Sequence, residues 1–142
     1  MDTEKIIQDA IKAEVAAHDL YAKASEMVSV PSTKDLLTNL AHEELKHKQM
    51  LESMDLNKLG EFDSDATIDV AQNLAMTPLD ELNDVQEIMQ LAIRREQAEH
   101  DNYEHLKSAF TSNDVKALFE KLSVEESKHK ALLEKEYALM FD

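Results

Sequence analysis

The sequence contains no cysteine and no tryptophan, and it has only one glycine and two prolines. Without cysteine, the chain forms no disulfide, has no thiol nucleophile and cannot hold Cys-ligated zinc or an iron–sulfur cluster. Any metal site in this chain must therefore be built from oxygen atoms and imidazoles. Because glycine and proline are scarce and Ala, Leu, Glu and Lys are abundant, the composition predicts an all-α protein with short connections.

Positive charge is also scarce, with 15 basic against 30 acidic residues and a net charge of −15. This balance argues against nucleic acid or an anionic membrane as a partner, because both require a basic face. No apolar run approaches the roughly 20 residues that span a bilayer, and the opening MDTEK does not resemble a signal peptide. We therefore expect a cytoplasmic protein, with residues 1–142 as one domain.

The spacing of apolar residues predicts four long helices. The first covers about 3–28 and is broken by VSVPSTKD, after which Ser32 is expected to cap a second helix reaching about Leu56. A crossover of about 57–77 follows, with NKLGEFDSD as a loop and TIDVAQNLA as a short helix. Thr77-Pro78 is expected to open a third helix that ends near Phe110. TSND then caps a fourth helix that reaches about residue 140.

The chain repeats itself at an interval of 82 residues, so that 10–52 aligns with 92–134 without a gap. The identities include Ala10/Ala92, Ile11/Ile93, Glu14/Glu96, His18/His100, Tyr21/Tyr103, Leu40/Leu122, Glu43/Glu125, Glu44/Glu126, His47/His129 and Leu51/Leu133. The pattern indicates two repeated helical hairpins, at about 3–56 and 78–140. Two hairpins that bury one face on each other predict a four-helix bundle with a pseudo-twofold axis and a long crossover between its second and third helices.

Acidic and histidine side chains interrupt the apolar stripe of these helices. In the second helix the stripe falls at positions 37, 40, 44, 47, 51 and 54, and Glu44 and His47 occupy two of them. Each hairpin supplies one Glu from its first helix and one Glu-x-x-His from its second; together these are Glu14, Glu44, His47, Glu96, Glu126 and His129.

Burying four carboxylates without compensation is costly, so positive charge should lie among them. Two divalent cations would balance the four carboxylates, with one histidine for each cation. This ligand set is that of the di-iron and di-manganese carboxylate bundles. The alternative is a metal-free bundle whose buried polar groups satisfy one another.

The same segments resemble the ferritin-like superfamily, and most closely the di-iron domain of rubrerythrins. IKAEVAAHDLY and IRREQAEHDNY resemble the first and third helices of that family, with a ligand Glu and a Tyr seven residues later. LAHEELKHKQML and LSVEESKHKALL resemble its second and fourth helices. The resemblance implies a ferritin-like four-helix bundle with two iron ions. It implies the following roles: Glu44 and Glu126 as bridging ligands, Glu14 and Glu96 as more terminal ligands, and His47 and His129 as the imidazole ligands.

Glu99 lies three residues after Glu96, whereas Ala17 occupies the matching place in the first hairpin. Rubrerythrins resemble this chain in having an additional Glu on the third helix. Oxidation of two Fe(II) to Fe(III) adds two positive charges, which a fifth carboxylate can partly neutralise. The resemblance implies that Glu99 is a ligand that exchanges with His47 during redox cycling; the alternative is an ordinary solvated Glu.

Tyr21 and Tyr103 follow Glu14 and Glu96 by one heptad, and we expect their hydroxyls to orient the ligand carboxylates rather than only to pack in the core. We expect His18 and His100 to lie beside the metal site or at its rim, and Glu43 and Glu125 to lie on the surface. The Met residues 27, 50, 54, 76, 89 and 140 are expected to fill the core.

For function, the resemblance implies a peroxidase in which a diferrous site reduces hydrogen peroxide to water. The chain departs from full rubrerythrins in having no Cys for a rubredoxin module, so a separate protein such as a rubredoxin must supply electrons. The alternatives are a ferroxidase or iron store that uses oxygen, an oxygen-activating hydroxylase, and a metal-stabilised binding or sensor domain.

Iron is the metal that the resemblance implies, although oxygen and imidazole ligands also suit manganese or adventitious zinc. The length of the crossover leaves room for an exchanged hairpin, and we expect a homodimer or a larger homo-oligomer.

Overall fold

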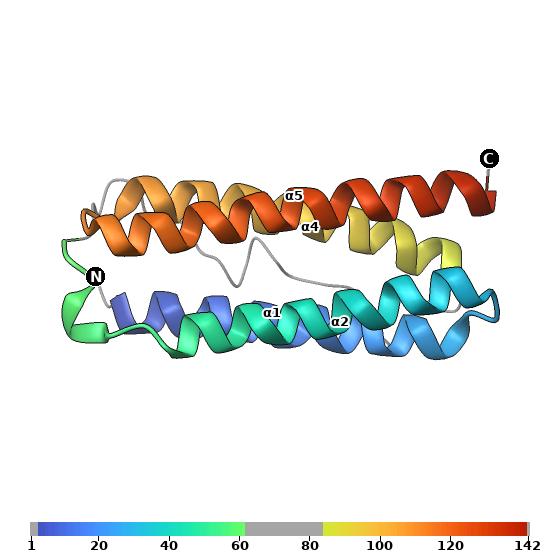
Figure 1. Cartoon of the computed structure of the whole chain (residues 1–142), viewed down its shortest axis with the longest axis horizontal. Coiled ribbons are helices and arrows are strands. Elements are labelled where there is room, and N and C mark those ends of the chain that lie inside the picture. The colour runs from blue at the N-terminus through green and yellow to red at the C-terminus, as the bar shows by residue number, and fades with distance from the viewer. Residues whose placement is uncertain (1–2, 62–83, 142) are drawn as a thin grey trace.

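The computed structural model describes residues 3–61 and 84–141. The elements are α1 (Thr3–Met27), α2 (Pro31–Glu52), the short 3-10 helix η1 (Leu56–Lys58), α4 (Val85–Ala109) and α5 (Asn113–Phe141). The helices α1 and α2 form one hairpin and α4 and α5 form the other, and the hairpins meet where α1 packs on α4 and α2 on α5 (Figure 1). This arrangement confirms the predicted all-α four-helix bundle. Among the described helices, none combines the length and the apolar character that crossing a membrane requires.

Helix starts follow local capping chemistry. The predicted cap at Ser32 is wrong, because α2 begins at Pro31 and the extended residue Val30 precedes it without a side-chain cap. The fixed φ of proline suits the first helical turn, where its missing N–H costs nothing. In contrast, the predicted cap of the fourth helix is present, since Ser112 Oγ accepts a hydrogen bond of 3.4 Å from the N–H of Val115.

The third long helix begins later than the sequence predicts. The side chain of Asp84 accepts a hydrogen bond of 2.8 Å from the N–H of Glu87, and Asp84 itself is extended, so α4 begins at Val85. The expected start at Thr77-Pro78 and the expected short helix TIDVAQNLA both lie outside the described residues.

The second helix is shorter than predicted, ending at Glu52 rather than near Leu56. Two side chains explain the early end. Ser53 Oγ donates to the carbonyl of Gln49 at 2.8 Å. The carboxylate of Asp55 accepts from the N–H of Asn57 at 3.0 Å, which starts the separate turn of η1.

The chain that leaves α2 is fastened to the loop between α4 and α5. Thr111 N–H donates to the carbonyl of Glu61 at 3.0 Å, and Glu61 N–H donates to Thr111 Oγ1 at 2.9 Å. Gly60 permits this approach, because its φ is 77° and a Cβ there would lie 2.8 Å from Thr111 Oγ1. The end of α2 and the start of α4 lie at opposite ends of the bundle (Figure 1).

Among residues 3–61 and 84–141, the buried apolar side chains form two clusters separated along the bundle. The first includes Ile7, Leu51, Leu106, Phe110 and Phe119. The second includes Leu20, Leu37, Leu40, Ile88, Met89 and Leu133. The residues between them in each long helix include buried carboxylates and histidines, so a charged layer lies between two hydrophobic ones.

Candidate metal centre

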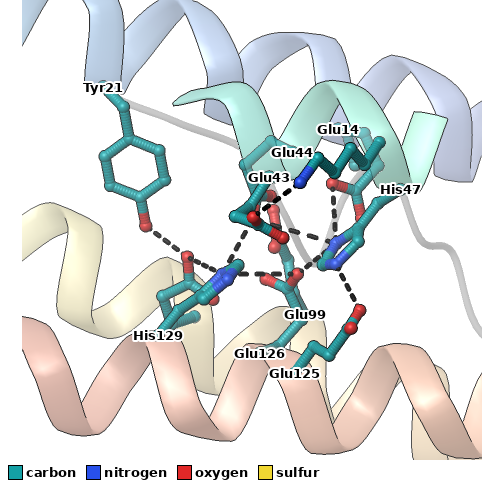
Figure 2. A network of polar contacts seen from close by, with 12 residues as sticks. Glu14, Tyr21, Glu43, Glu44, His47, Glu99, Glu125, Glu126 and His129 are labelled. Carbon is teal, nitrogen blue, oxygen red and sulfur yellow. Dashed lines mark hydrogen bonds and ion pairs between the residues drawn. The ribbon is translucent and has the colours of Figure 1, made fainter. Parts of the chain in front are cut away.

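All seven residues predicted as ligands are buried in this charged layer, with exposed fractions of 6% or less. They come from all four long helices: Glu14 from α1, Glu44 and His47 from α2, Glu96 and Glu99 from α4, and Glu126 and His129 from α5. Figure 2 shows that the labelled members of this set point toward a common centre between the hairpins. The structure therefore brings the predicted set together.

Two overlapping groups of these residues can each surround a cation. One group contains Glu14, Glu44, His47 and Glu126, and the other contains Glu44, Glu96, Glu126 and His129. Within each group the ligand atoms lie within 4.8 Å of one another. Glu44 and Glu126 belong to both groups, so the geometry offers two neighbouring cation positions that share these two carboxylates.

The contacts within the site follow the pseudo-twofold relation of the hairpins. His47 Nδ1 lies 2.6 Å from Glu126 Oε1, and His129 Nδ1 lies 3.0 Å from Glu44 Oε1. The two imidazole rings are nearly parallel, with centroids 5.6 Å apart and an interplanar angle of 10°. Each hairpin's histidine thus faces the shared carboxylate of the other hairpin.

The tyrosines repeat this reciprocity. Tyr21 donates its hydroxyl proton to Glu96, and Tyr103 donates to Glu14, so each hydrogen bond crosses from one hairpin to the other. Burial raises the pKa of both phenols well above the usual 10.0, and the neighbouring carboxylates raise it further. Both tyrosines therefore stay protonated and available as donors, in the position expected for groups that orient the carboxylates.

The donor atoms fit a pair of metal ions. Among the described residues, the buried side-chain atoms that make no hydrogen bond include both carboxylate oxygens of Glu44 and of Glu126, one oxygen each of Glu14, Glu96 and Glu99, and Nδ1 of His47 and of His129. Buried polar atoms nearly always have partners. Atoms that lie close together without hydrogen-bonding one another are arranged as ligands around a cation would be.

Electrostatics indicate how unfavourable the layer is without cations. Burial raises the pKa of Glu44 and Glu126 well above the usual 4.5, and the surrounding carboxylates raise it further. Burial would also raise the pKa of Glu96, but its contacts with Glu126 and His129 outweigh burial and lower it. Burial lowers the pKa of His47, yet the nearby carboxylates prevail and raise it to about 9. The site therefore retains protons where cations would otherwise supply the positive charge.

Glu99 is buried beside the site but belongs to neither four-residue group. Arg95 Nη2 lies 3.3 Å from Glu99 Oε1, one helical turn away on α4. Burial raises the pKa of Glu99 to about 7, against the lowering effects of its contacts with Glu126 and Arg95. The buried position contradicts the reading of Glu99 as an ordinary solvated Glu.

Two residues at the site are missed by the sequence interpretation. Glu125, predicted on the surface, is partly buried, and its Oε2 lies 2.7 Å from His47 Nε2, the ring nitrogen that faces away from the shared carboxylates. Arg95 is the other. A signal for Arg95 was available, because it replaces the matching Ala13 of the first hairpin and lies four residues before Glu99.

The remaining candidate residues lie around the site. Glu43, predicted on the surface, is half-exposed: it pairs with Lys46 at 3.1 Å, and its carboxylate also forms a three-residue group with His47 and His129 whose ligand atoms lie within 4.8 Å of one another. His18 is 29% exposed in its side chain and contacts Asp19, and His100 Nδ1 lies 2.9 Å from the carbonyl of Ser123. Neither His18 nor His100 is part of the groups that can surround a cation.

Fold and site together define a ferritin-like bundle with a buried carboxylate and histidine cluster. The Rubrerythrin family matches residues 5–85, more than half of the sequence, and the chain belongs to this family. A hypothetical protein from Pyrococcus furiosus has a similar structure, with a TM-score of 0.72 and 20% sequence identity over 98% of this chain and 90% of that one. At this identity the likeness concerns the fold alone. No curated protein matches the sequence.

Proposed function

We propose that the charged layer is a di-iron centre and that the chain is a rubrerythrin-like peroxidase. Glu44 and Glu126 would bridge the two ions, because they alone occur in both four-residue groups. The remaining ligands would be Glu14 and His47 for one ion and Glu96 and His129 for the other, with Glu99 as an additional carboxylate beside them. Manganese in one position, or adventitious zinc, is compatible with the same donor atoms.

The reaction consumes one hydrogen peroxide, two electrons and two protons, and yields two water molecules. Iron held by these ligands would supply the two electrons. The protein's own part is to hold the ligands in place, to keep the site dry through two flanking apolar clusters, and to keep ionisable groups near the reacting atoms. Glu99, a buried carboxylate that belongs to neither four-residue group, is a group that can hold a proton there.

The observation that carries the choice of a peroxidase is the buried fifth carboxylate. Four carboxylates balance two divalent cations, so Glu99, whose charge Arg95 balances, is a fifth carboxylate that the divalent ions do not require. A buried surplus carboxylate with an Arg partner favours a site that cycles between two charge states, rather than one that passes its metal onward.

A groove gives small molecules a way to the site. It lies between α2 and α5, has a volume of about 360 Å³, and is lined among others by Leu36, Glu43, Glu125 and His129. His129 lines this groove, and its Nδ1 lies 3.0 Å from Glu44 Oε1, so a small oxidant that enters the groove would arrive beside the ligands. Hydrogen peroxide and oxygen are both small enough to enter a groove of this volume.

The electron donor would be a separate protein, of which a rubredoxin is one example. Residues 1–142 hold no cysteine for an iron–sulfur centre, so under this proposal they would receive electrons from such a donor. A homodimer or larger homo-oligomer would bring further copies of the site together.

A second candidate is a ferroxidase that uses oxygen to oxidise incoming Fe(II). Two observations favour it: the net charge of −15, and the acidic residues Glu43 and Glu125 that line the groove. Both features would concentrate cations near the centre.

The deciding experiment loads the protein anaerobically with two Fe(II) per chain and mixes it in a stopped-flow instrument with hydrogen peroxide or with dissolved oxygen. We expect oxidation by peroxide to be the faster by far and to stop at a diferric site without mineral growth. Faster oxidation by oxygen, repeated with each fresh addition of Fe(II), would instead support the ferroxidase. A protein that binds no iron under these conditions would exclude both.

A further inference from the structure

The two hairpins differ at two positions whose residues in the second hairpin, Arg95 and Glu99, form an ion pair with each other. Arg95 and Glu99 stand where the first hairpin has Ala13 and Ala17. In the structure Arg95 Nη2 and Glu99 Oε1 are 3.3 Å apart, and their side chains are 5% and 2% exposed. The second hairpin has therefore gained one buried positive and one buried negative charge, which leaves the net charge of the layer unchanged.

Arg95 is also anchored to the opposite hairpin. Its Nη2 donates a hydrogen bond of 3.1 Å to the carbonyl oxygen of Ala13 on α1, the residue at its own place in the repeat. The guanidinium is thus fixed between α1 and α4, and the same nitrogen reaches Glu99. An Arg held by two elements loses little freedom on forming an ion pair.

Charge counting assigns this pair a role. The two four-residue groups contain four carboxylates and two histidines, which balance two divalent ions without Glu99. We propose that Arg95 is a positioning residue that pairs with Glu99 and holds this carboxylate away from both cation positions while the ions are divalent. The inference rests on the proposed metal centre and adds the residue that controls its fifth carboxylate.

The test measures Co(II) binding to four proteins: the wild type, R95A, E99A and R95A/E99A. The double variant restores in the second hairpin the Ala pair of the first, and it is the matched reference. Co(II) is useful because its visible absorption weakens as its coordination number rises. The spectrum therefore shows whether a further ligand has joined, independently of any enzymatic activity.

The proposal fixes the sign of each result. R95A should bind Co(II) about tenfold more tightly and absorb less intensely, because the released carboxylate joins the ions. E99A should bind about tenfold more weakly, because an uncompensated guanidinium remains near the cations. R95A/E99A should return to within about threefold of the wild type, with the wild-type spectrum, because the two charges are removed together. R95K, which keeps the charge, should resemble the wild type.

Other patterns overturn the proposal. If R95A/E99A binds Co(II) as weakly as E99A, then Glu99 already serves as a ligand of divalent ions and Arg95 does not hold it away. This comparison remains decisive even if R95A alone fails to fold. It uses only E99A and R95A/E99A, and neither of these two proteins contains the buried carboxylate that R95A would leave without its Arg partner. An R95A protein that folds but keeps the wild-type affinity and spectrum has the same meaning. A wild type that binds no Co(II) overturns the metal centre itself, and the inference with it.

Discussion

The two hairpins supply the same ligands but surround them differently. In α1–α2, the Glu-x-x-His motif is preceded by Glu43, which is half-exposed and pairs with Lys46. In α4–α5 the matching Glu125 turns inward and contacts His47. The first hairpin also has Ala13 and Ala17 where the second has a buried ion pair. The ligands and the two tyrosines thus follow the repeat, whereas Arg95, Glu99 and the inward-turned Glu125 belong to the second hairpin.

The largest expected effect tests the part that is symmetric. Glu44→Ala and Glu126→Ala should each weaken metal binding by more than about 100-fold, because each carboxylate belongs to both cation positions. The losses should be alike, since the two residues occupy equivalent places. Metal analysis after reconstitution and desalting measures the effect, and Glu134→Ala, on the exposed side of α5, is the control. Retained occupancy in either variant would exclude the proposed ligand assignment.

The next effect concerns the pH dependence of the metal-free protein. The pKa of Glu99 rises from 4.5 to about 7 on folding, so the folded state binds more protons and stability falls as pH rises through this range. His47, raised from 6.5 to about 9, continues the decline to higher pH. We expect the melting temperature to drop by roughly 5 °C or more between pH 5 and pH 8.

Making the hairpins alike should reduce this dependence. R95A/E99A removes the titration of Glu99, so its melting temperature should change less than that of the wild type over the lower part of the range. Calorimetry or circular dichroism of both metal-free proteins provides the comparison. Equal slopes would show that Glu99 does not titrate as its surroundings indicate.

A smaller effect separates the two outer carboxylates. Glu125→Gln should weaken Co(II) binding by about tenfold, because a carboxylate on the outer nitrogen of a ligand histidine fixes the ring and increases its basicity. Glu43→Gln should change binding by less than about twofold, since the half-exposed Glu43 pairs with Lys46 and belongs to neither four-residue group. Competitive titration against a chelator resolves this difference. Equal effects from both variants would mean that the contact between Glu125 and His47 does not tune the site.

The smallest effect concerns the tyrosines, where the hairpins should be equivalent again. Tyr21→Phe and Tyr103→Phe each remove one hydrogen bond to a buried carboxylate. Each should lower the free energy of unfolding of the metal-free protein by about 1–2 kcal/mol. Urea denaturation measures both. A loss in one variant only would show that the reciprocity of these contacts does not extend to their energies.

Much of this architecture can be predicted from the sequence because the repeat constrains it. The helices, the hairpin pairing and the convergence of Glu44, His47, Glu126 and His129 all follow from spacings of three and four residues in two aligned copies. Helix ends are less predictable. Asp84 and Asp55 act through single hydrogen bonds, and such bonds compete locally with continued helix.

Glu125 shows a second limit of prediction. Its helical angle places it beside the site rather than in it, and only the crossing of α5 over α2 decides that its flexible side chain reaches His47. Arg95 is similar, because its role depends on the approach of Ala13 from the other hairpin. Contacts between the hairpins depend on how the hairpins pack, and the spacing of residues along a single helix does not predict that packing.

The position of the charged layer between two apolar clusters determines where local unfolding of the bundle should begin. Helical bundles usually open first at their ends, where contacts are few. Here the metal-free chain carries its least favourable interactions halfway along, while each end is closed by its own hydrophobic contacts. Amide hydrogen exchange in the metal-free protein should consequently be fastest around the middle turns of the long helices. Bound metal should slow the exchange there, because it stabilises the middle of the bundle.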